Sequence, residues 1–442
     1  MHKVLILGAG LVAGPMVRYL LDQDEFEVTV ASRTVSKAQA MVGDHPQGKA
    51  LALDVQDDAA LRVLVQKADL VVSLLPYIYH LKVAKQCLEY KKHLVTTSYV
   101  KPEMQALDSA AREAGLLFLN EIGIDPGIDH MSAKRVIDDV HANGGVVTTF
   151  VSYCGGFPAP EANTNPFGYK FSWSPRGVVM AGKNPAHYLW DGREVNIPGD
   201  ELFDNNWPLE VPGLGTFEAY PNRDAMPYTE TYGIEPTQTM FRGTLRYPGW
   251  CATLKKLSEL GLFDDKARED LAGMTFAELT AELTGADPGS DLKAALTAKL
   301  KLEEDSFVIS NMTWLGLLSD DPLPAGANTL IEVLADRMLA LMPYEPGERD
   351  MLVLYDIFYA QYPDRIERTT STLIDYGIPH GDSAMARLVS MPAAIAVKMV
   401  LTGQITATGV HVPVIPEIYK PVLDELETHG IKCVEETTVV EE

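Results

Sequence analysis

Residues 3–14, Lys3-Val-Leu-Ile-Leu-Gly-Ala-Gly-Leu-Val-Ala-Gly14, decide the fold of this chain. An apolar run typical of a buried parallel strand leads directly into a glycine turn, and an amphipathic run at residues 16–21 follows. Strand, glycine turn and helix in this order are the fingerprint of a dinucleotide-binding site. Gly8 permits the tight turn, Gly10 lets the backbone approach a pyrophosphate, and Ala13 lets the helix pack closely on the strand. The N–H groups at the start of the helix would hold the phosphates.

The residues after the second predicted strand, 27–31, indicate which dinucleotide binds. That strand ends in Ser32-Arg33-Thr34. A site that prefers NAD usually carries Asp or Glu near this point, to bind the ribose 2′-hydroxyl. A guanidinium between two hydroxyls instead suits a dianionic 2′-phosphate, so we expect NADP(H) as the cofactor. The alternative is a glycine turn in another kind of βαβ protein, with Arg33 as a solvated loop charge.

Strand and helix patterns continue to alternate up to about residue 120. Further strands are predicted at residues 50–53, 69–75, 93–96 and 116–119, with helices between them. Six strands separated by helices predict an α/β fold with a Rossmann-type, doubly wound parallel sheet. Asp57 is a good N-cap for the helix that follows the third strand.

Ligands of such sheets lie beyond the carboxyl ends of the strands. This rule selects the loops at 8–14, 75–80, 97–101 and 120–130, and the third strand ends at Asp54-Val55, where this fold usually meets the adenine. The predicted cofactor contacts are Gly8, Gly10, Leu11, Val12, Ala13, Ser32, Arg33, Thr34, Asp54, Val55, Leu75, Pro76, Tyr77, Ser98, Val100, Ile124 and Pro126.

The pattern changes after residue 120. Residues 154–250 are crowded with Gly, Pro and aromatic residues, which favours short strands of an antiparallel sheet, whereas residues 251–345 are helical and suit packing or dimerisation better than chemistry. The tail is expected to fold back on the first domain, and its acidic end, residues 435–442, to be frayed. The predicted domains are a dinucleotide-binding domain (1–122 and 384–442), an α+β substrate domain (123–250 and 346–383) and an inserted helical subdomain (251–345).

Composition limits the possible partners. The 442 residues include 37 Lys and Arg against 61 Asp and Glu, and the formal net charge is −24. Nucleic acids and anionic membranes both need a basic surface, so neither is expected as a partner. No apolar run approaches the roughly 18 residues that span a bilayer, and the chain enters a strand without a signal peptide. We expect a cytoplasmic protein and, on general frequency, a homodimer.

The cysteines give no sign of a metal site. Cys87, Cys154, Cys251 and Cys433 are widely dispersed and lack the C-x-x-C spacing of zinc sites. Neither a bound metal nor a disulfide framework is therefore expected.

Five residues could carry proton chemistry. Tyr99 follows the fifth strand inside the predicted crevice. A phenol there can exchange a proton with an amine or carbonyl, or its ring can simply pack against the nicotinamide. Asp125 lies in Asp-Pro-Gly, so it is either a general base or a turn residue. Cys154 ends a strand, and by itself it fits a small buried hydrophobe better than a reactive group. Asp129 is expected to cap the following helix, and Lys170 and His130 are weaker acid–base candidates.

The second domain carries arginines among aromatic, glycine and hydroxyl residues. They are Arg176, Arg223, Arg242 and Arg246. In so acidic a chain this setting suggests clamps for carboxylates, although any one of them could form a surface ion pair. Several on one sheet favour a substrate with two or more carboxylates.

Long motifs in the same segments give the chain a resemblance to a known family. They include Ala-Ser-Arg-Thr (31–34), Asn-Glu-Ile-Gly-Ile-Asp-Pro-Gly-Ile-Asp-His (120–130), Ser-Tyr-Cys-Gly-Gly-Phe-Pro (152–158), Asn-Pro-Phe-Gly-Tyr-Lys-Phe-Ser-Trp-Ser-Pro-Arg-Gly (165–177) and Arg-Gly-Thr-Leu-Arg-Tyr (242–247). Over nearly its whole length the chain resembles the saccharopine dehydrogenase/reductase family, in its NADP-dependent, L-glutamate-forming branch.

The resemblance implies a reaction and a set of residues. Saccharopine, NADP⁺ and water would give L-glutamate, 2-aminoadipate 6-semialdehyde and NADPH, reversibly, in lysine metabolism. It implies Tyr99, Asp125 and Cys154 as catalytic groups for proton transfer. Saccharopine has three carboxylates, which matches the arginine-rich second domain. The implied substrate contacts are Ser98, Tyr99, Asp125, Trp173, Ser174, Arg223, Thr244, Leu245 and Arg246.

One departure and two alternatives accompany this interpretation. Fungal members tend to have Ala-Arg-Pro where this chain has Ala13-Gly14-Pro15, so a basic residue near the phosphates is absent. One alternative is a carboxynorspermidine-type synthase that condenses a diamine with an amino-acid semialdehyde. The other is a non-catalytic NADP-binding scaffold that keeps only the fold.

Overall fold

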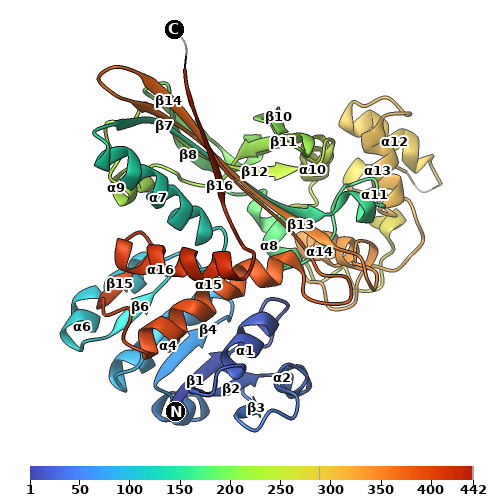
Figure 1. The fold of residues 1–442 in the computed structure, drawn as a ribbon. Helices are drawn as coiled ribbons and strands as arrows, with labels where there is room; N and C mark the ends of the chain where they lie inside the picture. Colours follow the sequence, from blue (N-terminus) through green and yellow to red (C-terminus); the bar gives the residue numbers. More distant parts are fainter. Residues whose placement is uncertain (288, 441–442) are drawn as a thin grey trace. The chain divides into compact units, whose positions relative to one another are not determined.

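The structure is a computed structural model that describes residues 1–287 and 289–440 (Figure 1). It consists of two compact units, each built from separate stretches of chain. Unit 1 contains residues 1–147, 231–233 and 360–442, and unit 2 contains residues 148–230 and 234–359. Residues 251–345 lie within unit 2. The finer division into three domains stays a prediction.

Unit 1 contains a seven-stranded sheet in the order β15-β6-β5-β4-β1-β2-β3. Every pair in it is parallel, which confirms the predicted doubly wound sheet. The strand order reverses between β1 and β4, the switch point where such sheets bind their ligands. The strands are β1 (His2–Leu7), β2 (Phe26–Ser32), β3 (Gly48–Ala52), β4 (Leu70–Ser73), β5 (His93–Val95), β6 (Leu117–Leu119) and β15 (Gly409–His411).

Helices cover both faces of this sheet. On one face α3 (Asp58–Lys67), α4 (His80–Glu89) and α6 (Asp108–Glu113) bury their apolar residues against β1, β4 and β5 in a single cluster. Asp57 caps α3, because its carboxylate accepts from the N–H groups of Ala59 and Ala60, as predicted. The other helices of unit 1 include α1 (Gly14–Leu21), α2 (Val35–Val42), α5 (Pro102–Gln105), α7 (Ile128–Ala142), α15 (Ala384–Leu401) and α16 (Pro416–Thr428).

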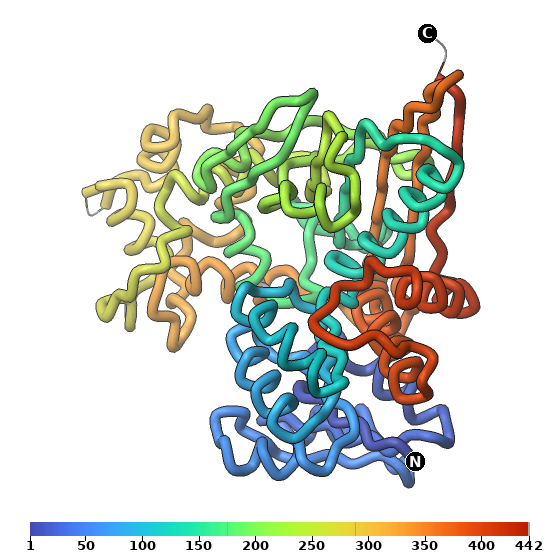
Figure 2. The backbone as a smooth tube through the Cα atoms, turned by 90° about the vertical axis from the view of Figure 1, so that its left-hand side faces the viewer, coloured from blue at the N-terminus to red at the C-terminus, as the bar shows by residue number. Residues whose placement is uncertain are grey.

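Helix α15 corrects one expectation from the sequence. It has 18 residues and a mean hydropathy of 1.6, so by length and composition it could cross a membrane. The predicted absence of so long an apolar run is therefore wrong. Of this stretch, 72% is buried inside the structure. Helix α15 packs on α1 and α16; Figure 2 draws α1 in blue and the two C-terminal helices in orange to red. This degree of burial is typical of a core helix.

Unit 2 is organised by strands in the order β10-β11-β12-β7-β13. The predicted antiparallel sheet is wrong at one pair, since β12 and β7 run parallel. Strands so far apart in the chain are not joined by a hairpin, so they can pair either parallel or antiparallel. The strands are β7 (Val146–Pro158), β8 (Ala186–Trp190), β9 (Arg193–Ile197), β10 (Trp207–Val211), β11 (Gly215–Pro221), β12 (Thr239–Arg246) and β13 (Asp350–Gln361).

The helices of unit 2 follow its strands in the chain. One short helix, α9 (Pro227–Tyr232), ends in residues that belong to unit 1. The remaining ones are α8 (Pro175–Ala181), α10 (Trp250–Glu259), α11 (Phe276–Thr284), α12 (Leu292–Leu300), α13 (Phe307–Trp314) and α14 (Leu330–Leu341).

The end of the chain forms a strand that the sequence did not predict. In unit 1, β16 (Val434–Val439) pairs antiparallel with β14 (Ile366–Tyr376), so the expectation of a frayed end is wrong for these residues. The hydroxyls of Thr369 and Thr437 lie 2.9 Å apart across the pair. Thr437, Thr438 and Val439 are β-branched, and β-branched residues favour extended backbone once a partner strand is available. Residues 441–442 lie outside the described residues.

Candidate active site

The glycine turn after β1 has the shape that a pyrophosphate needs. Gly8 has φ of 114°, and a Cβ on it would lie 2.9 Å from the carbonyl oxygen of Leu74, so only glycine fits there. The loops after β1 and β4 therefore touch at the switch point. A Cβ on Gly10 would meet no atom within 4 Å, which leaves open space along the backbone for a ligand. Ala13 is fully buried beneath α1, as close helix packing requires.

The residues after β2 and β3 are available to the adenosine end of a dinucleotide. Arg33 and Thr34 are exposed, and in the described part of the chain no ion pair of Arg33 is found. The Thr34 N–H points to Ser32 Oγ at 3.4 Å. Asp54 is exposed and accepts from the Gln56 N–H at 2.9 Å. An unpaired guanidinium beside two hydroxyls fits a 2′-phosphate.

The remaining predicted cofactor contacts follow β1, β3, β4, β5 and β6 at the same edge of the sheet. Leu11 and Tyr77 are 67% and 64% exposed, and large apolar side chains left in solvent beside a glycine turn can cover bound rings. The residues present therefore fit NADP(H). The others in this set are Val12, Val55, Leu75, Pro76, Ser98, Val100, Ile124 and Pro126, whose contacts with the cofactor stay predictions.

Two of the three predicted catalytic groups meet in unit 1. The Tyr99 hydroxyl donates to Asp125 Oδ1 at 2.8 Å. Both side chains are half-buried, and they follow β5 and β6, which are neighbouring parallel strands. The peptide bond between Asp125 and Pro126 is cis. A phenol bonded to a carboxylate is a pair that can pass a proton to or from a reacting nitrogen or water.

A buried histidine holds the Ser98 side chain next to Tyr99. His80 Nε2 lies 2.8 Å from Ser98 Oγ, and His80 Nδ1 lies 2.9 Å from Ser73 Oγ. Burial lowers the pKa of His80 to about 4. The ring is thus neutral at pH 7 and joins two hydroxyls by hydrogen bonds.

The pKa of His80 predicts a pH dependence of stability. Between pH 6.5 and about 4 the unfolded chain protonates this histidine while the folded chain does not. The free energy of unfolding should therefore fall as the pH drops through this interval, by at most about 3 kcal/mol from His80. In His80→Asn, urea unfolding between pH 7 and 4.5 should show a smaller fall than in the wild type. The same change at the exposed His380 is the control, and equal slopes for wild type and His80→Asn would contradict the assignment.

Asp129 does not cap α7 in the way predicted. The helix starts at Ile128, so Asp129 stands inside its first turn and Gly127 is the N-cap residue. The Asp129 carboxylate instead accepts from the N–H groups of Gly127 and His130, at 2.5 and 2.8 Å. Because Asp-Pro-Gly is a tight turn, the helix begins one residue earlier than the position that the sequence suggested.

Unit 2 holds a second group of predicted residues, two of which, Arg246 and Trp173, contact Tyr169. Cys154 on β7 is half-buried and lies opposite Thr244 on β12. The guanidinium of Arg246 stacks on the ring of Tyr169 at 5.1 Å. Trp173 Nε1 donates to the Tyr169 hydroxyl at 3.2 Å. Ser174, the neighbour of Trp173, caps α8 through the Gly177 N–H.

Arg246 is the most informative member of this group. It is 7% exposed, and its Nε has no hydrogen-bond partner among the described residues. Burial disfavours its charge, but the oxygens of Tyr220 and Tyr169 and the thiol of Cys154 outweigh burial and raise its pKa. A buried charge without a counterion is unfavourable. A carboxylate from a ligand would supply the missing partner.

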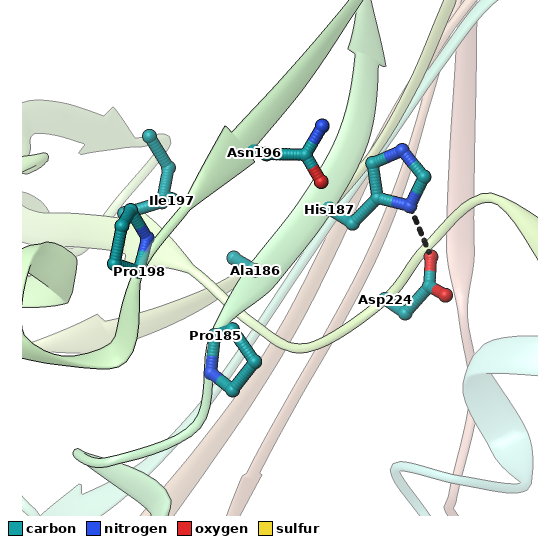
Figure 3. A pocket seen from close by; sticks show the side chains of 7 residues that line it. All are labelled: Pro185, Ala186, His187, Asn196, Ile197, Pro198 and Asp224. Carbon is teal, nitrogen blue, oxygen red and sulfur yellow. Dashed lines mark ion pairs between the residues drawn. The ribbon is translucent and has the colours of Figure 1, made fainter.

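Arg223 is exposed and held in an unusual backbone conformation. Its φ is 59°, a left-handed value that is uncommon outside glycine,. Its carbonyl accepts from the His187 N–H at 3.0 Å, and the next residue, Asp224, pairs with His187 Nδ1 at 3.2 Å. Figure 3 shows this pair at the edge of a pocket lined by Pro185, Ala186, His187, Asn196, Ile197, Pro198 and Asp224.

The other candidate groups have structural partners. Arg176 forms an exposed ion pair with Glu332 at 2.7 Å, the surface role left open for any of the arginines. Arg242 is buried and stacks on Tyr228. Lys170 is buried against Glu348 at 2.5 Å. His130 is fully buried in unit 1, with Nε2 2.8 Å from Glu121 Oε2.

Sequence reasoning missed four residues beside these groups. Glu121, His80, Tyr169 and Trp250 all contact predicted site residues. For Glu121 and Tyr169 the available signal was their position within the long motifs at 120–130 and 165–177, and His80 ends the loop at 75–80 that follows a strand. Trp250 carried no such signal. Their types alone suggested ordinary core or surface roles.

Two family models together cover most of the chain. The saccharopine dehydrogenase NADP binding domain matches residues 4–119. The saccharopine dehydrogenase C-terminal domain matches residues 123–431.

Whole-chain relatives agree with these matches. The chain is 42% identical to the saccharopine dehydrogenase [NADP(+), L-glutamate-forming] of Schizosaccharomyces pombe, over 99% of both chains. It is 42% identical to the Saccharomyces cerevisiae enzyme of the same name, over 98% of this chain and 99% of that one. It is 40% identical to the mitochondrial alpha-aminoadipic semialdehyde synthase of Bos taurus, over 99% of this chain and 48% of that protein.

A solved structure has the same fold. Apo saccharopine dehydrogenase (L-Glu forming) from Saccharomyces cerevisiae superposes with a TM-score of 0.90 at 40% identity, covering 99% of this chain and 100% of that chain. The resemblance seen in the motifs is thereby confirmed over the full length, and the chain belongs to the saccharopine dehydrogenase family.

Proposed function

We propose that this chain is an NADP-dependent oxidoreductase that interconverts saccharopine with L-glutamate and 2-aminoadipate 6-semialdehyde. One observation carries the proposal: 42% identity over 98–99% of the chain with the L-glutamate-forming enzymes of three fungi. Because the similarity extends through both units, it includes the nucleotide-binding loops and the arginine-bearing sheet. The bovine relative fits the same reaction within lysine metabolism.

The residues of each unit fit a part of this reaction. Bound NADP(H) would accept a hydride from the secondary-amine carbon, or return it. Tyr99 and Asp125 share a proton that can move to or from the substrate nitrogen or the water that enters,. Arg246 offers a buried positive charge to one substrate carboxylate,. Cys154 and Arg223 complete the proposed set, with the backbone of Cys154 fixed beside Thr244.

The buried guanidinium of Arg246 also favours saccharopine over a diamine as the substrate. A diamine-using synthase would need acidic groups around an ammonium, whereas Arg246 Nε is a donor that no described residue satisfies,. A non-catalytic scaffold would bind NADPH without any turnover.

An assay of NADPH oxidation tests these functions together. Semialdehyde plus L-glutamate should consume NADPH, and saccharopine plus NADP⁺ should regenerate it. A diamine in place of glutamate should give no turnover. Binding of NADPH with no reaction in either direction would refute the enzyme proposal. We also propose a homodimer, on general frequency, which sedimentation equilibrium would test.

Arg33 is expected to select NADPH over NADH. Loss of a hydrogen bond to a charged group is worth about 1.5–3 kcal/mol, so Arg33→Ala should weaken NADPH binding about 10- to 150-fold and leave NADH binding almost unchanged. Fluorescence titration with both cofactors measures this ratio. Arg62→Ala, a change on α3 outside the predicted site, is the control. An unchanged NADPH/NADH ratio in Arg33→Ala would contradict the assignment.

A further inference from the structure

Glu121 has an unusual position for a glutamate. It follows β6, is 2% exposed and has φ of 57°. A left-handed backbone at a residue other than glycine is strained and persists only where the surroundings hold it. A buried carboxylate likewise needs partners for its oxygens. Two unfavourable features at one residue, directly beside the predicted catalytic pair, call for a functional reason.

The partners of Glu121 lie on both sides of Tyr99. The Glu121 N–H donates to the carbonyl oxygen of Ser98 at 3.2 Å. Its Oε1 accepts from the Val100 N–H at 2.8 Å. One residue therefore binds the main chain directly before and directly after Tyr99. Since Asp125 lies only four residues further along, the same segment carries both the support and the acceptor for the Tyr99 hydroxyl.

A second set of contacts fixes the carboxylate itself. Glu121 Oε2 lies 2.8 Å from His130 Nε2, and His130 Nδ1 lies 2.6 Å from the Tyr232 hydroxyl. A carboxylate only accepts, so Nε2 donates to it. His130 and Tyr232 are 0% and 1% exposed, so solvent does not compete for these bonds. A second carboxylate oxygen, Asp129 Oδ1, lies 3.8 Å from His130 Nδ1.

We propose that Glu121 is a positioning residue that sets the placement of Tyr99 against Asp125, with His130 and Tyr232 as its fixed support. This inference rests on the proposed function, in which Tyr99 and Asp125 move the proton. A misplacement of about 1 Å can lower the rate of a reaction about 100-fold. The bonds to Ser98 and Val100 leave the Tyr99 main chain little freedom to make that shift.

A double-mutant cycle on kcat tests the proposal. At saturating NADPH, Glu121→Ala should lower kcat about 10- to 100-fold. If Glu121 acts through the Tyr99 hydroxyl, the same change in the Tyr99→Phe background should lower kcat less than about twofold further. Equal losses in both backgrounds would overturn the proposal. Because Ser98 and Val100 are also predicted cofactor contacts, the dissociation constant of NADPH is measured for each variant.

Two further variants separate positioning from folding. Glu121→Gln keeps an oxygen for the Val100 N–H, so it should recover most of the kcat that Glu121→Ala loses. A loss as large as that of alanine would count against the proposal. If Glu121→Ala does not fold, Tyr232→Phe replaces it, since this change removes only the far hydroxyl. Its smaller loss of kcat, about two- to fivefold, should also vanish in the Tyr99→Phe background, and an additive loss would overturn the proposal.

Asp138→Asn is the matched control. Asp138 lies on α7 in the same unit, and its carboxylate accepts from Lys134 Nζ at 2.7 Å and from the Tyr419 hydroxyl at 2.6 Å. No bond links it to residues 97–101 in the described part of the chain. The kcat of Asp138→Asn should stay within twofold of wild type even if the Tm of this variant falls as far as that of Glu121→Gln. If wild type shows no turnover at all, the proposed function fails. If wild type turns over but the losses of kcat from the Glu121 and Tyr99 changes are additive, only the role of Glu121 is refuted.

Discussion

Replacing Asp125 with asparagine should lower kcat by about 10²- to 10⁴-fold, the usual worth of a positioned acid–base group. The amide has nearly the same shape, so the loop after β6 and the bond from Tyr99 can remain. It cannot take up a proton at neutral pH, so transfer through the Tyr99–Asp125 pair stops. Single-turnover oxidation of NADPH with the semialdehyde and L-glutamate measures the effect separately from product release.

The NADPH dissociation constant of Asp125→Asn should stay within about threefold of wild type, because no negative charge that contacts phosphate is changed. Tyr99→Phe should show a smaller loss of kcat, since it leaves the carboxylate in place. The combined variant should be little slower than Asp125→Asn alone, because the two groups share one proton path. A kcat for Asp125→Asn within fivefold of wild type would remove Asp125 from the mechanism.

Arg246→Met is expected to weaken substrate binding and to leave stability unchanged or increase it. Removing one partner of a buried charge interaction typically loses about 2–5 kcal/mol, so the KM for saccharopine should rise about 30-fold or more. In the absence of ligand, however, Arg246 is 7% exposed and its Nε has no hydrogen-bond partner in the described part of the chain. Apolar replacement of poorly compensated buried charges can stabilise a protein by about 1–4 kcal/mol.

Steady-state kinetics and urea unfolding of the ligand-free protein measure the two effects of Arg246→Met. Arg246→Lys should give an intermediate KM, since it keeps the charge but loses the planar fork of donors. Arg176→Met is the control, because Arg176 is exposed and paired with Glu332, and exposed pairs contribute about 0–1 kcal/mol. A loss of stability in Arg246→Met without a rise in KM would show that Arg246 serves the fold.

The parallel sheet of unit 1 could be predicted because its signals are local. Lys3 to Leu7, the turn at Gly8 and Gly10 and the helix after it are adjacent in the chain, and each depends on residue type and spacing alone. The rule that ligands lie beyond the carboxyl ends of parallel strands then located the cofactor loops. Even the cap at Asp57 follows from a local preference,.

Contacts between distant residues needed the tertiary structure. The strand at Val434–Val439 depends on a partner about 70 residues earlier, and the parallel pairing of β12 with β7 depends on the path of the chain between them. The sequence likewise identified Arg246 as an arginine among aromatics, but not as a buried side chain whose Nε has no hydrogen-bond partner among the described residues.

Residue type and spacing by themselves determined the doubly wound sheet, the nucleotide loops and the residue types suited to proton transfer. Only the tertiary structure decided that Tyr99 donates to Asp125, that Glu121 binds the main chain on both sides of Tyr99, and that Arg246 Nε has no hydrogen-bond partner among the described residues. The physical reason is that strand and helix periods arise from neighbours in the chain. Hydrogen-bond partners and burial, in contrast, depend on which distant segments the fold brings together.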